Sequence, residues 1–294
     1  MISSISLASE ITLGVHLIET LVSLYKIIFV QVVIYNSCSW SNLTKIQVTK
    51  LQTIQLKFLK RILHAPASTT NSFIYLELGI TPIEYNIHMA QLNFLHHILT
   101  LDKLDPVLQD YHQQKIFPFE KNWYNEVSDL RKKYDIIEND DDIANMCKER
   151  WKSIVRKHVF EFALDSLIKE NSLKSKTSHH PAPEKLQLRD YFAYLPPADA
   201  RLLFALRCGT FDLKSFRRYQ YEEGDTFCRL CGKEEETVDH IVNRCETITR
   251  TGVVSDVFST NREDVEVVVR IMKVFVELAD KKEESEETED CESI

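Results

Sequence analysis

The chain has 294 residues, of which 44% are hydrophobic and 27% charged, and this composition excludes a disordered protein. The formal net charge of −8 argues against a nucleic-acid partner, but residues 281–294 hold two Lys against seven Asp and Glu, a net charge of −5. The rest of the chain is therefore close to neutral, and its charge has to be considered segment by segment. Six Gly and eight Pro are few for this length, which favours helices.

Residues 11–35 are strongly apolar, which raises the question of a membrane span or a signal peptide. His16, Glu19, Lys26 and Gln31 interrupt the run, so an uninterrupted stretch of about 18 apolar residues is missing. No Lys or Arg precedes Lys26 to form the positively charged start of a signal peptide. We expect a buried helix and no membrane contact, with a membrane span as the alternative.

Helical periodicity is clear in the next segment, Ser41–Leu63, where apolar residues recur about every 3.6 residues and Pro66 lies just beyond the end. This predicts an amphipathic helix. Its apolar stripe consists of Ile46, Leu51, Ile54, Phe58, Leu59 and Ile62.

Residues 67–101 predict two helices around a turn, with Gly79 as the C-terminal cap of the first helix. Thr81, Pro82 and Glu84 predict a capping box for the second. The later predicted segments are a helix that opens at Asp105-Pro106, a long amphipathic helix over 141–170, a polar loop over 171–185, a short helix over 195–209, and a helix over 262–282 followed by a disordered acidic tail.

The stretch CRLCGKEEETVDHIVNRC, residues 228–245, contains a candidate metal site. Cys228, Cys231, His240 and Cys245 have the spacing C-x2-C-x8-H-x4-C. Three thiolates and one imidazole are the tetrahedral ligand set of a structural Zn²⁺ site, which leaves no position for a catalytic water. Seven cysteines, most of them far apart, do not suggest a disulfide framework, so we expect a reducing compartment. The alternative is three unrelated buried cysteines with a surface histidine.

The residues around these ligands predict how the site is built. Two residues between Cys228 and Cys231 form a tight turn, and Gly232 is free to adopt a positive φ just after it. We expect a short helix to follow, with Glu234–Glu236 at its N-terminus and His240 and Cys245 facing the ion.

The resulting prediction is an all-α, multi-helical fold with a small CCHC zinc module near the C-terminus. The predicted regions are a helical region over 1–66, a second helical region over 67–175, a linker with the zinc module over 176–250, and an amphipathic helix with a disordered acidic tail over 251–294.

Residues 200–245, which include the CCHC pattern, resemble the C-terminal CCHC segment of non-LTR (LINE-type) retrotransposon reverse transcriptases. Residues 25–40 and 51–63 are similar to the helical thumb of that family, and residues 74–99 to the linker that follows it. The resemblance covers most of residues 25–280 in the order of the family. The Cys and His spacing is its most specific part.

The sequence departs from this family where catalysis would occur. A polymerase centre needs paired aspartates on a strand hairpin to hold two Mg²⁺, and residues 138–146 contain Asp140, Asp141 and Asp142 without a strand pattern. We interpret these acids as helix-capping and solvated. No endonuclease pattern follows Cys245 either. The resemblance therefore implies a non-catalytic C-terminal part of such an enzyme, without the palm, and the missing polymerase portion becomes a candidate partner.

Two basic segments are candidates for nucleic-acid binding. The segment 41–66 contains no acid, and its candidates are Lys45, Lys50, Lys57, Lys60 and Arg61. The segment 201–221 interleaves cations with aromatic residues, as single-strand binders do, and its candidates are Arg207, Lys214, Arg217, Arg218 and Tyr219. The alternatives are a solvated polar face for the first segment and, for Arg207, a role in capping its helix.

His96-His97 and His179-His180 do not have metal-ligand spacing, so we expect the first pair to be partly buried and the second exposed. We therefore predict an intracellular, non-enzymatic protein, nuclear or cytoplasmic, that binds RNA, DNA or both and has no small-molecule substrate. The alternatives are a helical protein-interaction scaffold in which zinc is purely structural, and a nonfunctional retrotransposon relic.

Overall fold

The computed structural model describes residues 17–117, 121–178, 180–221, 225–248, 254, 256 and 258–292. Within these residues the fold is all-α, as predicted, and β pairing is confined to an isolated bridge between Phe227 and Glu235. The helices in chain order are α2 (Leu17–Leu24), η2 (Tyr25–Val30), α3 (Gln31–Ile34), η3 (Ser37–Ser39), α4 (Lys45–Ile62), α5 (Asn71–Leu78), α6 (Ile83–Leu99), α7 (Pro106–Ile116), α8 (Trp123–Lys133), α9 (Asp140–Asn145), α10 (Lys148–Ser172), α11 (Tyr191–Tyr194), α12 (Pro197–Arg207), η4 (Lys214–Gln220), η5 (His240–Arg244) and α13 (Arg262–Glu292).

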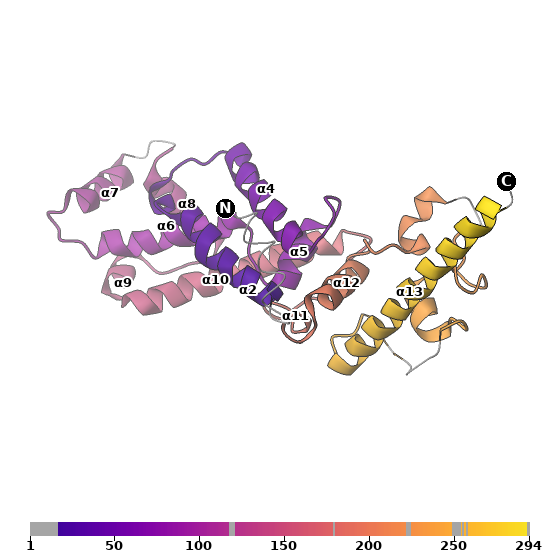
Figure 1. Ribbon diagram of the computed structural model, residues 1–294. Coiled ribbons are helices and arrows are strands. Elements are labelled where there is room, and N and C mark those ends of the chain that lie inside the picture. Colours follow the sequence, from indigo (N-terminus) through magenta and orange to yellow (C-terminus); the bar gives the residue numbers. More distant parts are fainter. Residues whose placement is uncertain are drawn as a thin grey trace.

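Two hydrophobic cores hold these helices together. One core joins α2, α4 and α5 to α11, α12, the Cys/His segment and α13. The other is formed by α6, α7, α8 and α10, with Trp151, Val155 and Val159 of α10 fully buried in it. Figure 1 shows α7 and α9 at one end of an elongated molecule and α13 at the other. Neither core coincides with one of the four predicted regions, because the first core brings the N-terminal helices and the Cys/His segment together.

The N-terminal helix is only partly buried. Leu17, Ile18 and Leu21 of α2 lie in the first core, in agreement with the predicted buried helix, whereas Ile27 and Val32 further along are 66% and 72% exposed. By length and composition, Leu17–Ile34 would be able to cross a membrane, and 33% of it is buried inside the protein. A helix packed into a protein core meets the same criteria. Residues 11–16 of the predicted helix lie outside the described residues.

Local turn chemistry is confirmed at two helix ends. Gly79 ends α5 with φ of +59°, and a β-carbon there would lie 2.1 Å from the Gln187 backbone, so the position requires glycine. Asp105 caps α7 by accepting a hydrogen bond from Val107 N at 2.8 Å. The predicted capping box at Thr81 is wrong, because α6 starts at Ile83 and the Thr81 hydroxyl instead accepts a hydrogen bond from Asn86.

The predicted helix over 141–170 is divided in two. Asn139 forms a capping box with Asp142 and starts α9, which ends before Met146, and α10 then begins at Lys148. Asp140 accepts hydrogen bonds from Arg131 and Lys115 at 2.9 and 2.8 Å. It is therefore held in ion pairs and is not solvated, and within the described residues it belongs to no metal-ligand group.

The predicted disordered acidic tail is also wrong for residues 283–292, because α13 continues to Glu292. No Gly or Pro interrupts the segment 262–292, and Glu has a helix propensity close to that of Lys and Arg. His96 is buried as expected, and its Nε2 lies 2.8 Å from Met146 O. His180 is not the exposed residue we expected, because its ring packs between Phe73 and Phe258.

A buried carboxylate fastens α5 to the C-terminal half. Glu77, with 1% of its surface exposed, accepts hydrogen bonds from Tyr191 OH at 2.7 Å and Arg207 Nη1 at 3.4 Å. Its other oxygen accepts from Arg189 Nε at 3.2 Å. Because Arg207 is itself only 2% exposed, each charge depends on the other to offset the cost of its burial.

We expect Glu77→Ala to lower the free energy of unfolding by about 3–5 kcal/mol, because the substitution leaves the Arg207 guanidinium buried without its counter-charge. Urea denaturation followed by circular dichroism measures the change. Glu161→Ala, at an exposed position on α10, is the matched control and should change stability by less than about 0.5 kcal/mol. Equal stability of the two variants would contradict the role given to Glu77.

Candidate metal centre

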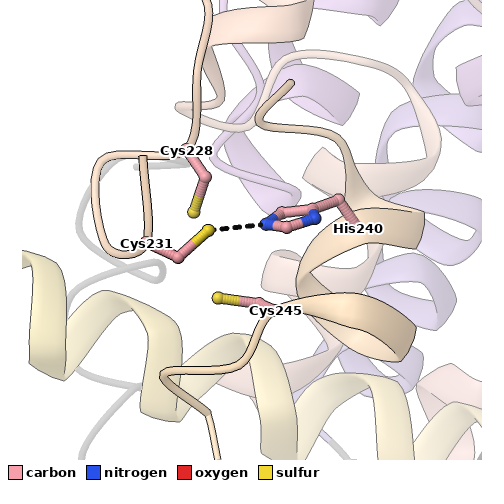
Figure 2. Close-up of side chains that lie close together, drawn as sticks. All are labelled: Cys228, Cys231, His240 and Cys245. Carbon is pink, nitrogen blue, oxygen red and sulfur yellow. Dashed lines mark hydrogen bonds between the residues drawn. The ribbon is translucent and has the colours of Figure 1, made fainter. Parts of the chain in front are cut away.

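The four predicted ligands converge in space, as Figure 2 shows. One donor atom from each of Cys228, Cys231, His240 and Cys245 lies within 4.8 Å of all the others. Cys231 Sγ and His240 Nε2 are 3.3 Å apart. A tetrahedron with bonds of about 2.3 Å has edges of roughly 3.8 Å, so a small contraction of the cluster would enclose one ion.

The first two cysteines lie on a short hairpin. Cys228 N donates a hydrogen bond to Glu234 O at 2.7 Å, and Gly232 N donates one to Cys228 O at 2.8 Å. Gly232 has φ of +67° and open space around it, so the turn uses the backbone freedom of glycine as predicted. The Phe227–Glu235 bridge closes the hairpin.

The other two ligands depend on an unusual helical turn. In an α-helix, residues five positions apart point about 140° away from each other, which would separate His240 from Cys245. The structure has a π-helical turn here, and Cys245 N donates a hydrogen bond to His240 O at 2.7 Å, which returns Cys245 to the same side. Thr237 Oγ1 caps the start of this turn by accepting from His240 N at 3.0 Å.

The predicted position of Glu234–Glu236 at the helix N-terminus is therefore wrong, because these three residues belong to the hairpin and the helical turn starts after Thr237. Glu234 nevertheless reaches the site, since its Oε2 lies 3.3 Å from His240 Nδ1 and 2.8 Å from Arg244 Nε. The hydrogen bond from Arg244 lowers the pKa of Glu234 and keeps it ionised. A proton on His240 Nδ1, next to this carboxylate, leaves the lone pair of Nε2 directed at the cluster.

Burial and protonation of the ligands agree with a metal site. Cys228, His240 and Cys245 are 1–2% exposed, and Cys231 is half-buried. Burial raises the pKa of Cys228 to about 12, so a cation on its sulfur is needed to keep it a thiolate at neutral pH. Because His240 is buried among the cysteines, the alternative of unrelated cysteines with a surface histidine is wrong, and the group can hold a metal ion.

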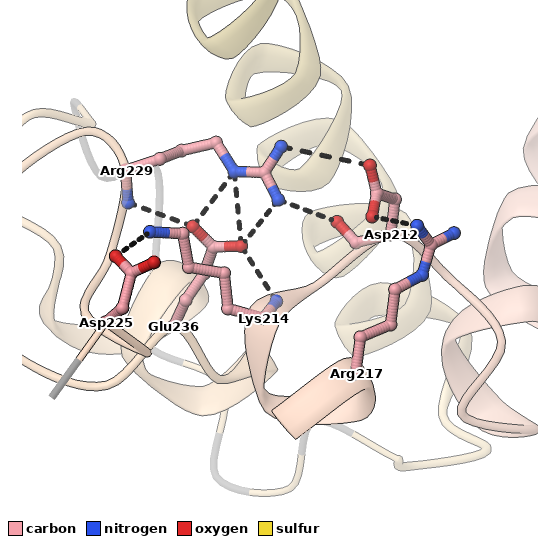
Figure 3. Close-up of polar contacts among 6 residues, drawn as sticks. All are labelled: Asp212, Lys214, Arg217, Asp225, Arg229 and Glu236. Atoms are coloured by element: carbon pink, nitrogen blue, oxygen red, sulfur yellow. Dashed lines mark hydrogen bonds and ion pairs between the residues drawn. The ribbon is translucent and has the colours of Figure 1, made fainter. Parts of the chain in front are cut away.

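A second buried carboxylate fixes the hairpin beneath the site, as Figure 3 shows. Glu236 is fully buried and accepts hydrogen bonds from Arg229 N at 2.9 Å, Arg229 Nη2 at 2.9 Å and Lys214 N at 3.1 Å. Arg229 also donates from Nη2 to Asp212 O at 3.3 Å. Glu236 was not among the predicted residues, because an acid in a run of three glutamates gives no sign of burial in the sequence.

The cations predicted in the segment 201–221 are engaged within the protein. Ion pairs join Lys214 to Asp225 at 3.5 Å, Arg217 to Asp212 at 3.0 Å and Arg218 to Glu235 at 2.8 Å. Arg207 is buried against Glu77 and out of reach of a phosphate, and its Nη2 donates to Phe258 O and Ser259 O. We therefore withdraw Arg207 from the predicted interface. Tyr219 is 81% exposed and is available for stacking.

In contrast, most of the cations predicted on α4 are not paired within the protein. Lys45, Lys50, Lys57 and Arg61 are exposed, and none of the four forms an ion pair with another described residue. Lys60 is half-buried and donates from Nζ to Ala67 O at 2.6 Å. Lys50, Lys57 and Arg61 share one helix face, because they are spaced at i, i+7 and i+11. This face is the unpaired part of the predicted interface.

Part of the predicted apolar stripe of α4 lies on the same side. Ile46 and Ile54 are 68% and 54% exposed, whereas Leu59 and Ile62 are buried as predicted. The polar Gln55 occupies the buried face instead and bonds to Tyr25 OH, Tyr75 OH and Ile83 N.

Comparison of the chain with protein-family models, curated proteins and solved structures gives no match. The site is therefore interpreted from its own geometry.

Glu234→Gln is expected to weaken metal binding by about 10–100-fold, because the substitution removes the carboxylate beside His240 Nδ1 and keeps the four ligands. Competition against a chromophoric chelator measures the affinity. Glu263→Gln, exposed in the first turn of α13, removes the same charge away from the site and should bind metal as the unaltered chain does. Equal affinities for both variants would show that Glu234 does not orient the histidine.

Proposed function

We propose that the chain is a nucleic-acid-binding protein in which a structural Zn²⁺, held by Cys228, Cys231, His240 and Cys245, orders the C-terminal module. Three sulfurs and one imidazole nitrogen favour zinc over Mg²⁺ or Ca²⁺, which take oxygen ligands. Four protein ligands fill a tetrahedron, so zinc here supplies folding free energy and no reaction. In small zinc modules this contribution is about 10–16 kcal/mol.

The observation that carries the nucleic-acid proposal is the exposed face of α4. Lys50, Lys57 and Arg61 lie on one side of a helix whose segment contains no acid, and no described residue neutralises them. Such a face releases counterions when it lies along phosphates, which is the main source of affinity in sequence-independent binding. The module contributes less in this proposal, because Lys214, Arg217 and Arg218 are already paired.

This function agrees with the resemblance of the chain to the region that follows the palm in LINE-type reverse transcriptases. We propose that the chain binds RNA or DNA inside the cell and has no polymerase activity of its own. The missing polymerase portion is its proposed partner. A protein-interaction scaffold is the second candidate. The exposed apolar residues Ile27 and Val32 on the N-terminal helix favour it.

The zinc assignment predicts one equivalent of zinc per chain in protein purified under reducing conditions. Chelation should then release it and unfold the module, with loss of helical circular dichroism and of protease resistance around residues 226–248. Cys245→Ser should abolish stoichiometric zinc, whereas Cys147→Ser, at an exposed free cysteine, should retain it. Elemental analysis that finds no zinc in the unaltered chain would contradict the assignment.

The α4 face predicts that Lys50→Ala, Lys57→Ala and Arg61→Ala combined weaken binding to a mixed RNA and single-stranded DNA pool. The slope of log affinity against log salt should fall by about 2–3, since each lost phosphate contact removes about 0.7–0.9. Fluorescence anisotropy between 50 and 200 mM salt, where such slopes are measured, reports both quantities. The matched control is Lys214→Ala, Arg217→Ala and Arg218→Ala combined, which removes the same charge from paired positions and should change the slope less.

A further inference from the structure

A second group of unpaired cations lies on α10, outside the basic segments 41–66 and 201–221. The sequence KERWKSIVRK, residues 148–157, contains five cations and a single acid, Glu149. All five cations are exposed, and within the described residues none of them forms an ion pair. These cations are Lys148, Arg150, Lys152, Arg156 and Lys157.

The packing of α10 fixes which way these cations face. Trp151, Val155 and Val159 are fully buried in the second core, so this helix cannot rotate without exposing them. Lys148, Lys152 and Arg156 follow one another at i, i+4 and i+8 along one flank of the buried face. They form a row in which charges repeat about every 6 Å along the helix axis.

Lys26 of η2, from another part of the chain, feels the charge of this row. Partial desolvation and the nearby positive charge of Arg156 lower the pKa of Lys26. The Arg156 guanidinium lies 5.3 Å from the centre of the Phe160 ring, which supports its position. No described carboxylate forms an ion pair with Lys26 or Arg156. A bound anion would remove this repulsion.

We propose that the row Lys148, Lys152 and Arg156 is a second phosphate-binding surface that holds the backbone of a nucleic acid without reading its bases. The inference rests on the proposed nucleic-acid-binding function and names a further site for it. Regularly repeating cations on a straight helix suit a polymer of regularly spaced phosphates. The exposed residues Glu149 and Ser153, which neighbour the row, are polar.

The test uses the full zinc-loaded chain and the double variant Lys152→Glu, Arg156→Glu. Labelled single-stranded RNA, single-stranded DNA and duplex DNA are the probes. We expect about tenfold or greater weakening at low salt for every probe that binds, and a salt slope lower by about 2, because two phosphate contacts are lost. The weakening should be the same for different base sequences.

The matched control is Lys169→Glu with Lys174→Glu, which reverses the same charge at exposed positions at the far end of α10 and beyond it. Thermal melting of both variants confirms that they fold. The proposal is overturned if the two variants bind nucleic acid equally well, or if the row is needed only for binding to phosphatidylserine vesicles.

The α4 triple variant separates this proposal from the proposed function. If the α4 triple loses affinity while the α10 double variant binds like the unaltered chain, nucleic-acid binding stands and the second surface does not. If the unaltered chain binds none of the probes, both are overturned.

Discussion

The convergence of four donor atoms from two short segments is the constraint on which the C-terminal part of the molecule depends. The hairpin that carries Cys228 and Cys231 needs the left-handed turn at Gly232. The segment that carries His240 and Cys245 needs a turn closed between residues five positions apart. The segment that carries His240 and Cys245 contacts α13 and contains the buried residues Ile241 and Val242, so the ion would connect the hairpin to the long C-terminal helix.

Buried carboxylates determine which cations of this protein remain available to bind an anion. Glu77 forms an ion pair with Arg207 inside the protein, and Glu236 forms one with Arg229 near the candidate metal centre. The exposed acids Asp212, Asp225 and Glu235 pair with the remaining cations around the hairpin. The exposed cations Lys50, Lys57 and Arg61 of α4, and the five cations of residues 148–157 on α10, form no ion pair with a described residue.

Local features could be predicted from the sequence, whereas features that depend on distant contacts could not. The metal ligands, the Gly79 cap and the Asp105 cap each follow from neighbouring residues, and the structure confirms that they lie as expected. Arg207 was misinterpreted because its partner Glu77 lies 130 residues earlier in the chain.

Dependence on distant contacts also explains why the predicted apolar stripe of α4 is partly exposed. A periodicity of 3.6 residues shows that one face of a helix is apolar, but it does not show how much of that face another element covers. Gln55 is buried because three residues from other helices form hydrogen bonds with its side chain. Its neighbours in sequence give no indication of these partners.

The continuation of α13 to Glu292 changes what its terminal acids can do. A flexible tail of net charge −5 would be able to fold back onto the chain's own lysines and arginines and compete there with a polyanion. A 31-residue helix is about 46 Å long and stiff, so its backbone cannot fold back in this way. The net negative charge of this segment is therefore carried by the last turns of α13, at the opposite end of the molecule from α7 and α9.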